Sequence, residues 1–226
     1  MPRKFALILG ALAAIPAFAQ TIERPAVKVG DECHYNVFDN MRKDGKGEPE
    51  KVAERHAVVT AVEPDRIVVN FTQTILVPRD TEDIEAGEYV YDRDLNQLQI
   101  NARKFEPAYP YRYYPLTPGA EKKAKSEFPR LQGDGTTTVN LTGKASGWEN
   151  IAVPAGKFDT ITLVWEGGNI NRITRGRTGT GSAPAYETIT LSPATWCTVK
   201  GIKKNYKMGG QGIWSDRTSL LMSFKN

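Results

Sequence analysis

The sequence predicts an all-β fold, an antiparallel barrel or half-barrel of about ten to twelve short strands, with little helix outside the first 19 residues. Apolar and polar residues alternate with a period of two, most clearly over residues 67–77. The 14 prolines and 20 glycines are scattered between apolar runs, which is typical of short strands joined by turns. Prolines at 107, 110, 115 and 118 exclude a long helix in the middle of the chain.

The individual elements follow from alternation and from turn residues. The segment Pro-Ala-Gly-Lys at 154–157 predicts a tight turn in which Gly156 supplies a positive φ. Alanine, glutamate and lysine over residues 120–126 favour a short helical turn, the one helix expected after the N-terminal segment. The predicted strands cover residues 32–38, 52–62, 67–77, 89–91, 98–100, 136–141, 149–153, 158–166, 186–191, 195–206 and 218–224.

The N-terminus has the three parts of a secretory signal peptide. Arg3 and Lys4 precede an apolar run over residues 5–15, and the small residues Ala17 and Ala19 fit a cleavage site after Ala19. The run has about half of the ~20 residues that a spanning helix needs. We expect residues 1–19 to be removed and residues 20–226 to act as one β-barrel-like domain, periplasmic or secreted. A retained anchor or a buried helix is the alternative.

Charge and length narrow the classes of function. The whole chain has a net charge of +4, but after loss of Arg3 and Lys4 it keeps 28 basic and 26 acidic residues, a net charge of +2. A chain so close to neutral gives no argument for a nucleic-acid partner or an anionic membrane. No other segment approaches transmembrane length. About 200 residues suit one domain with its own core.

Cys33 and Cys197 are the only cysteines in the chain. In an oxidising compartment a disulfide between them is the default expectation. It would close a loop of about 165 residues and stabilise the fold by at most ~5 kcal/mol in the loop-entropy model. The alternative is two unpaired, buried cysteines.

The residues do not assemble a recognisable catalytic or metal centre. His34 and His56 fall on neighbouring predicted strands, but His34 points to the face opposite Cys33. A zinc site needs at least three protein ligands, and we expect neither a metal nor a cofactor. No Gly-x-Ser-x-Gly elbow is present in the sequence, and we predict no catalytic residue.

The candidates for ligand binding are Tyr109, Tyr111, Tyr113 and Arg112, which alternate in a proline-rich segment. Exposed, these rings would offer a surface to a peptide, glycan or acyl chain; buried, they would close one end of the barrel. Burial or partial burial is the favoured interpretation, because aromatic rings mostly pack. The basic stretch 200–207 could meet lipid phosphates or keep an edge strand soluble, and protection of an edge strand is the favoured interpretation.

Several segments together resemble a known family. They are Val-Gly-Asp-Glu at 29–32, Tyr-Pro-Leu-Thr-Pro-Gly at 114–119, Val-Pro-Ala-Gly-Lys-Phe-Asp-Thr at 153–160, Thr195-Trp196, and Thr-Ser-Leu-Leu at 218–221. The chain resembles the TapB-like family of exported, poorly characterised Gram-negative bacterial proteins. The resemblance implies a β-rich periplasmic domain and no catalytic residues. The family usually has an aromatic residue where Cys33 and Cys197 stand, so two cysteines here favour their pairing.

These observations favour a non-enzymatic periplasmic module. It would be an accessory of envelope assembly that contacts an envelope protein, or a carrier of an apolar ligand such as a lipid. One alternative is a hydrolase of envelope material that uses a carboxylate pair. Another is a structural or adhesive surface protein with exposed tyrosines and an unpaired sheet edge. A hollow interior lined by apolar side chains would distinguish the carrier.

Overall fold

The computed structural model describes residues 20–41, 48–77, 84–130, 134–174, 179–210 and 212–226. Twelve described strands form one closed antiparallel sheet, which confirms the predicted all-β barrel. The predicted signal peptide, residues 1–19, lies outside the described residues. The strands are β1 (Glu32–Asp39), β2 (Glu50–Val62), β3 (Arg66–Ile75), β4 (Ala86–Asp92), β5 (Gln97–Ile100), β6 (Arg103–Tyr109), β7 (Glu121–Pro129), β8 (Gly135–Val153), β9 (Gly156–Ile173), β10 (Gly179–Ser192), β11 (Thr195–Tyr206) and β12 (Ile213–Lys225).

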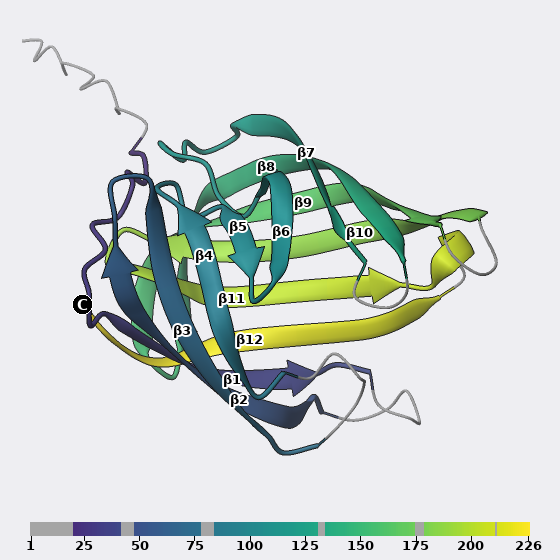
Figure 1. Cartoon of the computed structure of the whole chain (residues 1–226). Coiled ribbons are helices and arrows are strands. Elements are labelled where there is room, and N and C mark those ends of the chain that lie inside the picture. The colour runs from purple at the N-terminus through teal and green to yellow at the C-terminus, as the bar shows by residue number, and fades with distance from the viewer. Residues whose placement is uncertain (1–19, 42–47, 78–83, 131–133, 175–178, 211) are drawn as a thin grey trace, which may run out of the picture.

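The chain runs around the barrel as a meander, each strand pairing with the strands before and after it. Strand β1 pairs with both β2 and β12, and this contact between the first and last strands closes the sheet. Strands β8–β12 have 12 to 19 residues, whereas β4–β6 have 4 to 7. The long strands therefore extend beyond the short ones at one end of the barrel (Figure 1).

Strand alternation separates an inner from an outer face. In β3, Ile67, Val69 and Phe71 are buried, and the residues between them are not. This period of two is the pattern from which the strand was predicted. It also sets which side chains of the other strands enter the interior.

One expectation about the middle of the chain is wrong, and one strand there was not predicted. The helical turn expected over 120–126 is part of β7, in which Ser126 and Phe128 are buried and pair with β8. Ladder pairing and burial outweigh the local helix propensity of alanine, glutamate and lysine. Strand β6 was not predicted, because Pro107 interrupts its pattern; this strand pairs with β7 only at Glu106 opposite Glu127.

The hairpin with the clearest sequence pattern forms as predicted. Val153 pairs with Gly156, so Pro154 and Ala155 make a two-residue turn between β8 and β9. Gly156 has a φ of 136°, a conformation that favours glycine. Phe158 follows and is buried in the core. The two predicted strands at 136–141 and 149–153 are one strand, β8, with an irregular register between Ala145 and Trp148.

The apolar core has two main clusters, one under β8 and β9 and one that joins β2 and β3 to β11. Leu163 and Trp165 of β9 are almost fully buried in the first cluster, together with Leu141 of β8. The Trp165 ring lies against Gly143, where an added Cβ would come within 2.6 Å of it. The interior around Trp165 is filled by side chains.

A large bulge at the start of β11 brings the cysteines together. Ser192 pairs with Thr195 and Thr190 pairs with Lys200, so residues 196–199 of β11 face the single residue Leu191. The extra residues turn into the barrel. Cys197 bonds Cys33 of β1 at a Cα–Cα distance of 5.9 Å, although β12 lies between the two strands in the sheet. Both cysteines are fully buried.

Loss of the disulfide should destabilise the barrel. We expect the Cys33→Ala/Cys197→Ala variant to lose about 2–5 kcal/mol of unfolding free energy, because the unfolded chain gains freedom when the long loop opens. Denaturant unfolding measures the difference. Reductant should lower the stability of the wild type and leave that of the variant unchanged; equal stabilities of oxidised and reduced wild type would contradict the expectation.

Candidate functional site in the barrel interior

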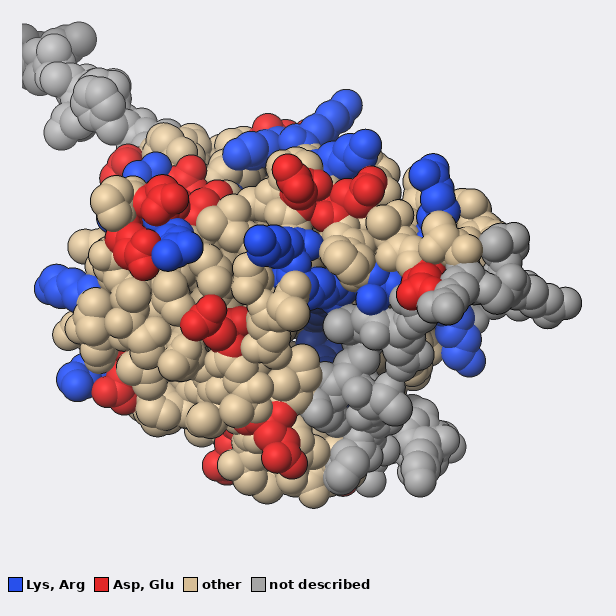
Figure 2. Space-filling view, in the orientation of Figure 1, with Lys and Arg blue, Asp and Glu red and all other residues tan. Residues whose placement is uncertain are grey.

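The barrel holds a cavity of about 610 Å³. Its walls come from β1–β7 and β10–β12 and from the loop after β6, and none of its lining residues belongs to β8 or β9. A second cavity of about 330 Å³ adjoins it. Figure 2 shows this face of the barrel hollowed beside β6, with Lys and Arg side chains gathered in the hollow. The two cavities share Arg103, Tyr109, Phe128, Glu187, Lys203 and Asn205.

The lining combines apolar and aromatic groups with charged ones. Strand alternation explains how charges enter the interior. Arg55 lies between the buried residues Ala53 and Ala57 in β2, and Glu187 lies two residues before the buried Ile189 in β10. These inward positions usually hold apolar residues. A charge at such a position is therefore exposed to the cavity instead of to the outside solvent.

One charged pair lies between the two cavities. Glu187 of β10 and Lys203 of β11 are directly opposite in the register. The Tyr109 hydroxyl donates a hydrogen bond of 3.3 Å to Glu187, and Lys203 Nζ lies 5.7 Å from the centroid of the Tyr109 ring. Lys203 borders both cavities. Its side chain is therefore accessible to solvent, although it lies on the inner face of the barrel.

The surroundings raise the pKa values of both Glu187 and Lys203. Burial raises the pKa of Glu187, an effect that Lys203 opposes. The charge of Glu187 raises the pKa of Lys203, against the effect of burial. Lys203 therefore stays cationic throughout the physiological pH range. The predicted edge-strand role of the basic stretch is wrong for this residue, because β11 lies inside a closed sheet and has a neighbour on each side.

The segment after β6 places Arg112 in the interior. Its guanidinium donates hydrogen bonds to the Trp196 carbonyl at 2.7 Å and to Thr198 Oγ1 at 3.0 Å, both in the β11 bulge. The backbone N–H groups of Tyr111 and Arg112 donate to Asn96 Oδ1. Arg112 is buried, and its hydrogen-bond acceptors in the described part of the chain are neutral groups.

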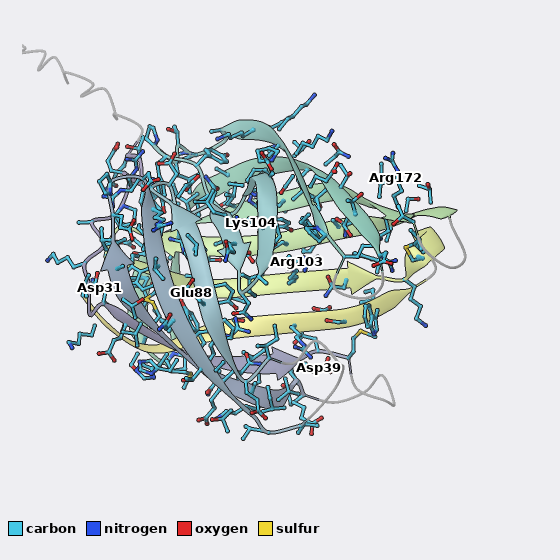
Figure 3. All side chains as sticks on the ribbon, viewed as in Figure 1. Asp31, Asp39, Glu88, Arg103, Lys104 and Arg172 are labelled. Carbon is cyan, nitrogen blue, oxygen red and sulfur yellow. A yellow bond between two sulfur atoms is a disulfide. The ribbon has the colours of Figure 1, made fainter. Side chains whose placement is uncertain are left out.

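Arg55 and Arg103 also border the cavity. Arg55 donates to Gln73 Oε1 at 2.9 and 2.7 Å, and its guanidinium lies 5.8 Å from the centroid of the Phe71 ring. Arg103, labelled on β6 in Figure 3, donates to the Pro129 carbonyl at 2.8 Å and lies 4.2 Å from the centroid of the Phe128 ring. The lining thus holds guanidinium groups in fixed positions.

The predicted ligand-binding residues do not all reach the cavity. Tyr109, Tyr111 and Arg112 line it, whereas Tyr113 packs against Trp165 in the apolar core and donates to the Ala120 carbonyl. The favoured interpretation, burial of the segment, agrees with these positions. The sequence prediction did not include Arg55, Glu187 or the tyrosines of β1 and β4, and it named Lys203 only as part of the basic stretch. The signal was a polar side chain at an inward position of an alternating strand.

Tyrosines surround the cavity and are held in their neutral form. Burial raises the pKa of Tyr35 to about 12 and places those of Tyr91, Tyr109 and Tyr111 well above the usual value. The Tyr35 hydroxyl accepts a hydrogen bond of 3.2 Å from the Thr198 backbone N–H. These hydroxyl groups are therefore neutral hydrogen-bonding groups in the cavity wall.

Comparisons with known proteins establish the fold. A crystal structure of a protein from Bacteroides fragilis, described as exported and with a YmcC-like fold, superposes with a TM-score of 0.52 at 14% identity, over 92% of this chain and 100% of that chain. A protein from Parabacteroides distasonis, described as a lipoprotein, gives 0.52 at 13% identity, over 91% and 100%. The chain therefore shares its barrel fold with these proteins.

A scan of protein-family models and a search of curated proteins found no match. Within the described residues, no helix is long and apolar enough to span a membrane.

The buried tyrosines predict a loss of stability at alkaline pH. Tyr35, Tyr91, Tyr109 and Tyr111 bind protons more tightly in the folded than in the unfolded chain, so their contribution is complete below about pH 10 and falls as pH rises above it. We expect their tyrosinate absorbance to appear together with the loss of the β circular-dichroism signal. A Tyr109→Phe/Tyr111→Phe variant should lose part of that late absorbance change; an unchanged amplitude would contradict the assignment.

Proposed function

We propose that this barrel is a non-enzymatic binding protein that holds an amphipathic ligand, an apolar chain with an anionic head group, in its interior. The observation that carries the proposal is the cavity of about 610 Å³, which lies within the roughly 300–1,000 Å³ typical of small-molecule sites. Its walls include Val69, Phe105 and Ile189, which suit an acyl chain. The interior is hollow where a carrier needs it to be.

The charges of the lining support an anionic head group. Five basic side chains border the cavity, whereas Glu187 is its one carboxylate among the described residues. Arg55 and Arg112 are positioned by neutral acceptors, so their charges are available to an incoming carboxylate or phosphate. A guanidinium group in a low-dielectric cavity attracts an anion more strongly than one in water. The five are Arg55, Arg103, Arg112, Lys203 and Arg217.

The alternatives have less support from the described residues. Hydrolysis by a carboxylate pair needs two acids about 5–10 Å apart, and the described lining offers Glu187 alone. Adhesion through tyrosines and an unpaired sheet edge does not suit a closed sheet in which Tyr109 and Tyr113 are buried. Binding is the function that the lining favours.

Location and family are part of the same proposal. A periplasmic or secreted protein, with residues 1–19 removed, would meet lipids and other amphiphiles of the cell envelope. Membership of the TapB-like family rests on the sequence segments, above all the β8–β9 hairpin at 153–160. A role as an accessory of envelope assembly is compatible with such a carrier, since delivery of a ligand requires a partner that receives it.

A cavity-filling variant tests the proposal. Gly201 lines the cavity, and a Cβ there would meet its nearest neighbours only at 3.7 and 3.8 Å. We expect Gly201→Trp to weaken binding of a fluorescent long-chain fatty acid by at least about tenfold, because losing roughly 55 Å² of apolar contact already costs about 1.4 kcal/mol. Gly147→Trp is the matched control, since a Cβ at Gly147 meets no atom within 4 Å and this residue lies outside the cavity.

Absence of any fatty-acid binding by the wild type, with no lipid copurifying in native mass spectra, would refute the carrier. Equal weakening by Gly201→Trp and Gly147→Trp would refute the cavity as the binding site.

The head-group assignment has its own test. We expect Arg55→Gln to weaken binding of the fatty acid more than binding of its methyl ester, because only the acid carries the charge that Arg55 attracts. Titrations of both ligands against the wild type and the variant measure the difference. An equal loss for acid and ester would show that Arg55 contributes packing and no charge recognition.

A further inference from the structure

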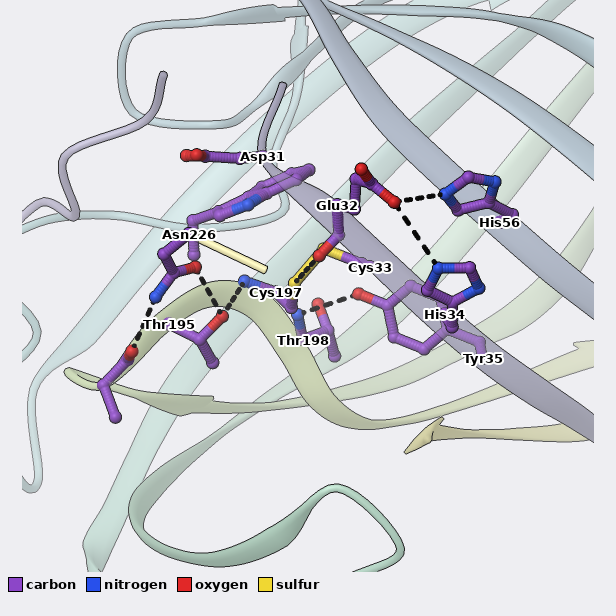
Figure 4. Close-up of a disulfide and its surroundings, with 12 residues drawn as sticks. Asp31, Glu32, Cys33, His34, Tyr35, His56, Thr195, Cys197, Thr198 and Asn226 are labelled. Carbon is purple, nitrogen blue, oxygen red and sulfur yellow. Dashed lines mark hydrogen bonds and ion pairs between the residues drawn. A yellow bond between two sulfur atoms is a disulfide. The ribbon is translucent and has the colours of Figure 1, made fainter. Parts of the chain in front are cut away.

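Three side chains able to bind a metal ion meet on the outer face of β1 and β2. Glu32 and His34 are two residues apart in β1, and His56 is opposite His34 in the register of the two strands. Cys33 lies between the first two and points inward to its disulfide. Alternation therefore directs all three side chains to the outside. Figure 4 shows the Glu32 carboxylate with dashed lines to both histidine rings.

The distances suit a single ion. Glu32 Oε2 lies 3.1 Å from His56 Nε2 and 3.7 Å from His34 Nε2. One ligand atom from each of the three residues lies within 4.8 Å of the others. Zinc bonds of about 2.0–2.2 Å at tetrahedral angles place two ligand atoms roughly 3.3 Å apart. The two carboxylate distances bracket that value, so small side-chain movements would complete the coordination.

The rings need one adjustment, and they have room for it. The His34 and His56 rings are stacked, with centroids 4.0 Å apart and planes inclined by 10°. Nitrogen lone pairs lie in the ring plane, so the two rings must splay for their lone pairs to converge on one ion. Their side chains are 44% and 37% exposed, which leaves space for rotation toward solvent.

We propose that Glu32, His34 and His56 form a binding site for a divalent transition-metal ion, represented by Zn²⁺. Two imidazoles and one carboxylate are a ligand set that zinc, nickel and copper accept. A water molecule would take the remaining position on the exposed side. Ca²⁺ and Mg²⁺ prefer oxygen ligands throughout and should not bind here.

The surroundings keep the carboxylate charged and the strands in place. Lys225 of β12 is opposite Glu32 in the register, with its Nζ 3.3 Å from Glu32 Oε1. The hydrogen bonds from Lys225 and His56 hold the pKa of Glu32 below its usual value. Lys225 therefore competes with a metal ion for the same carboxylate. The disulfide at Cys33 anchors β1 between Glu32 and His34.

Calorimetric titration of the metal-stripped, untagged protein with Zn²⁺ tests the site. We expect one ion per chain. His34→Asn, His56→Asn and Glu32→Gln should each lower the affinity by at least about tenfold, because loss of an outer-shell partner alone costs about 10–100-fold. Lys225→Met should raise the affinity, since it removes the competing charge. Glu166→Gln, an exposed carboxylate of β9, is the control and should bind as the wild type does.

A measurement on the wild type makes the test independent of the variants. The chain has only two histidines, so paramagnetic Ni²⁺ should broaden the imidazole NMR signals of both rings at equal metal and protein concentrations. Absence of Zn²⁺ binding by the wild type would overturn the proposal. Binding that survives His34→Asn and His56→Asn would also overturn it, and an affinity unchanged by Glu32→Gln would remove Glu32 from the ligand set.

Discussion

The closure of twelve strands into one sheet sets the conditions for the rest of this structure. Barrel diameter grows with strand number, and side chains fill the interior at about eight strands. Twelve strands enclose more volume than the buried apolar clusters occupy, and the cavity is the remainder. The pairing of β1 with β12 completes the circle and removes both sheet edges.

A hollow interior lowers the free-energy cost of placing polar side chains on the inner face of the barrel. In a packed core, Lys203 or Arg55 would lose its hydration without compensation. Here Lys203 is opposite Glu187 and borders open volume, and Arg55 is held by Gln73. The loop after β6 and the β11 bulge enter from the wall and meet through Arg112. These contacts reduce the open interior to a smaller cavity. Its wall combines apolar side chains with tyrosine hydroxyl groups and positively charged side chains.

The disulfide connects the interior to the outer surface. Cys197 sits in the bulge that contacts Arg112, and Cys33 sits between Glu32 and His34 in β1. The bond therefore fixes the cavity wall on one side of β1, and on the other side it fixes the strand that carries two of the three proposed metal ligands. The two proposed sites use opposite faces of the same strand and can be tested separately.

Local pattern determines strand positions, the Gly156 turn and the inward side of each strand, because alternation and turn chemistry act over a few residues. Those features were predictable, as was the pairing of the only two cysteines. Strand β7 and the bulge at 196–199 were not, because they depend on partners distant in the chain. The residues that share a site could not be predicted either. Glu187 contacts Tyr109 only because register and closure bring distant strands together. The same holds for His34, His56 and Glu32.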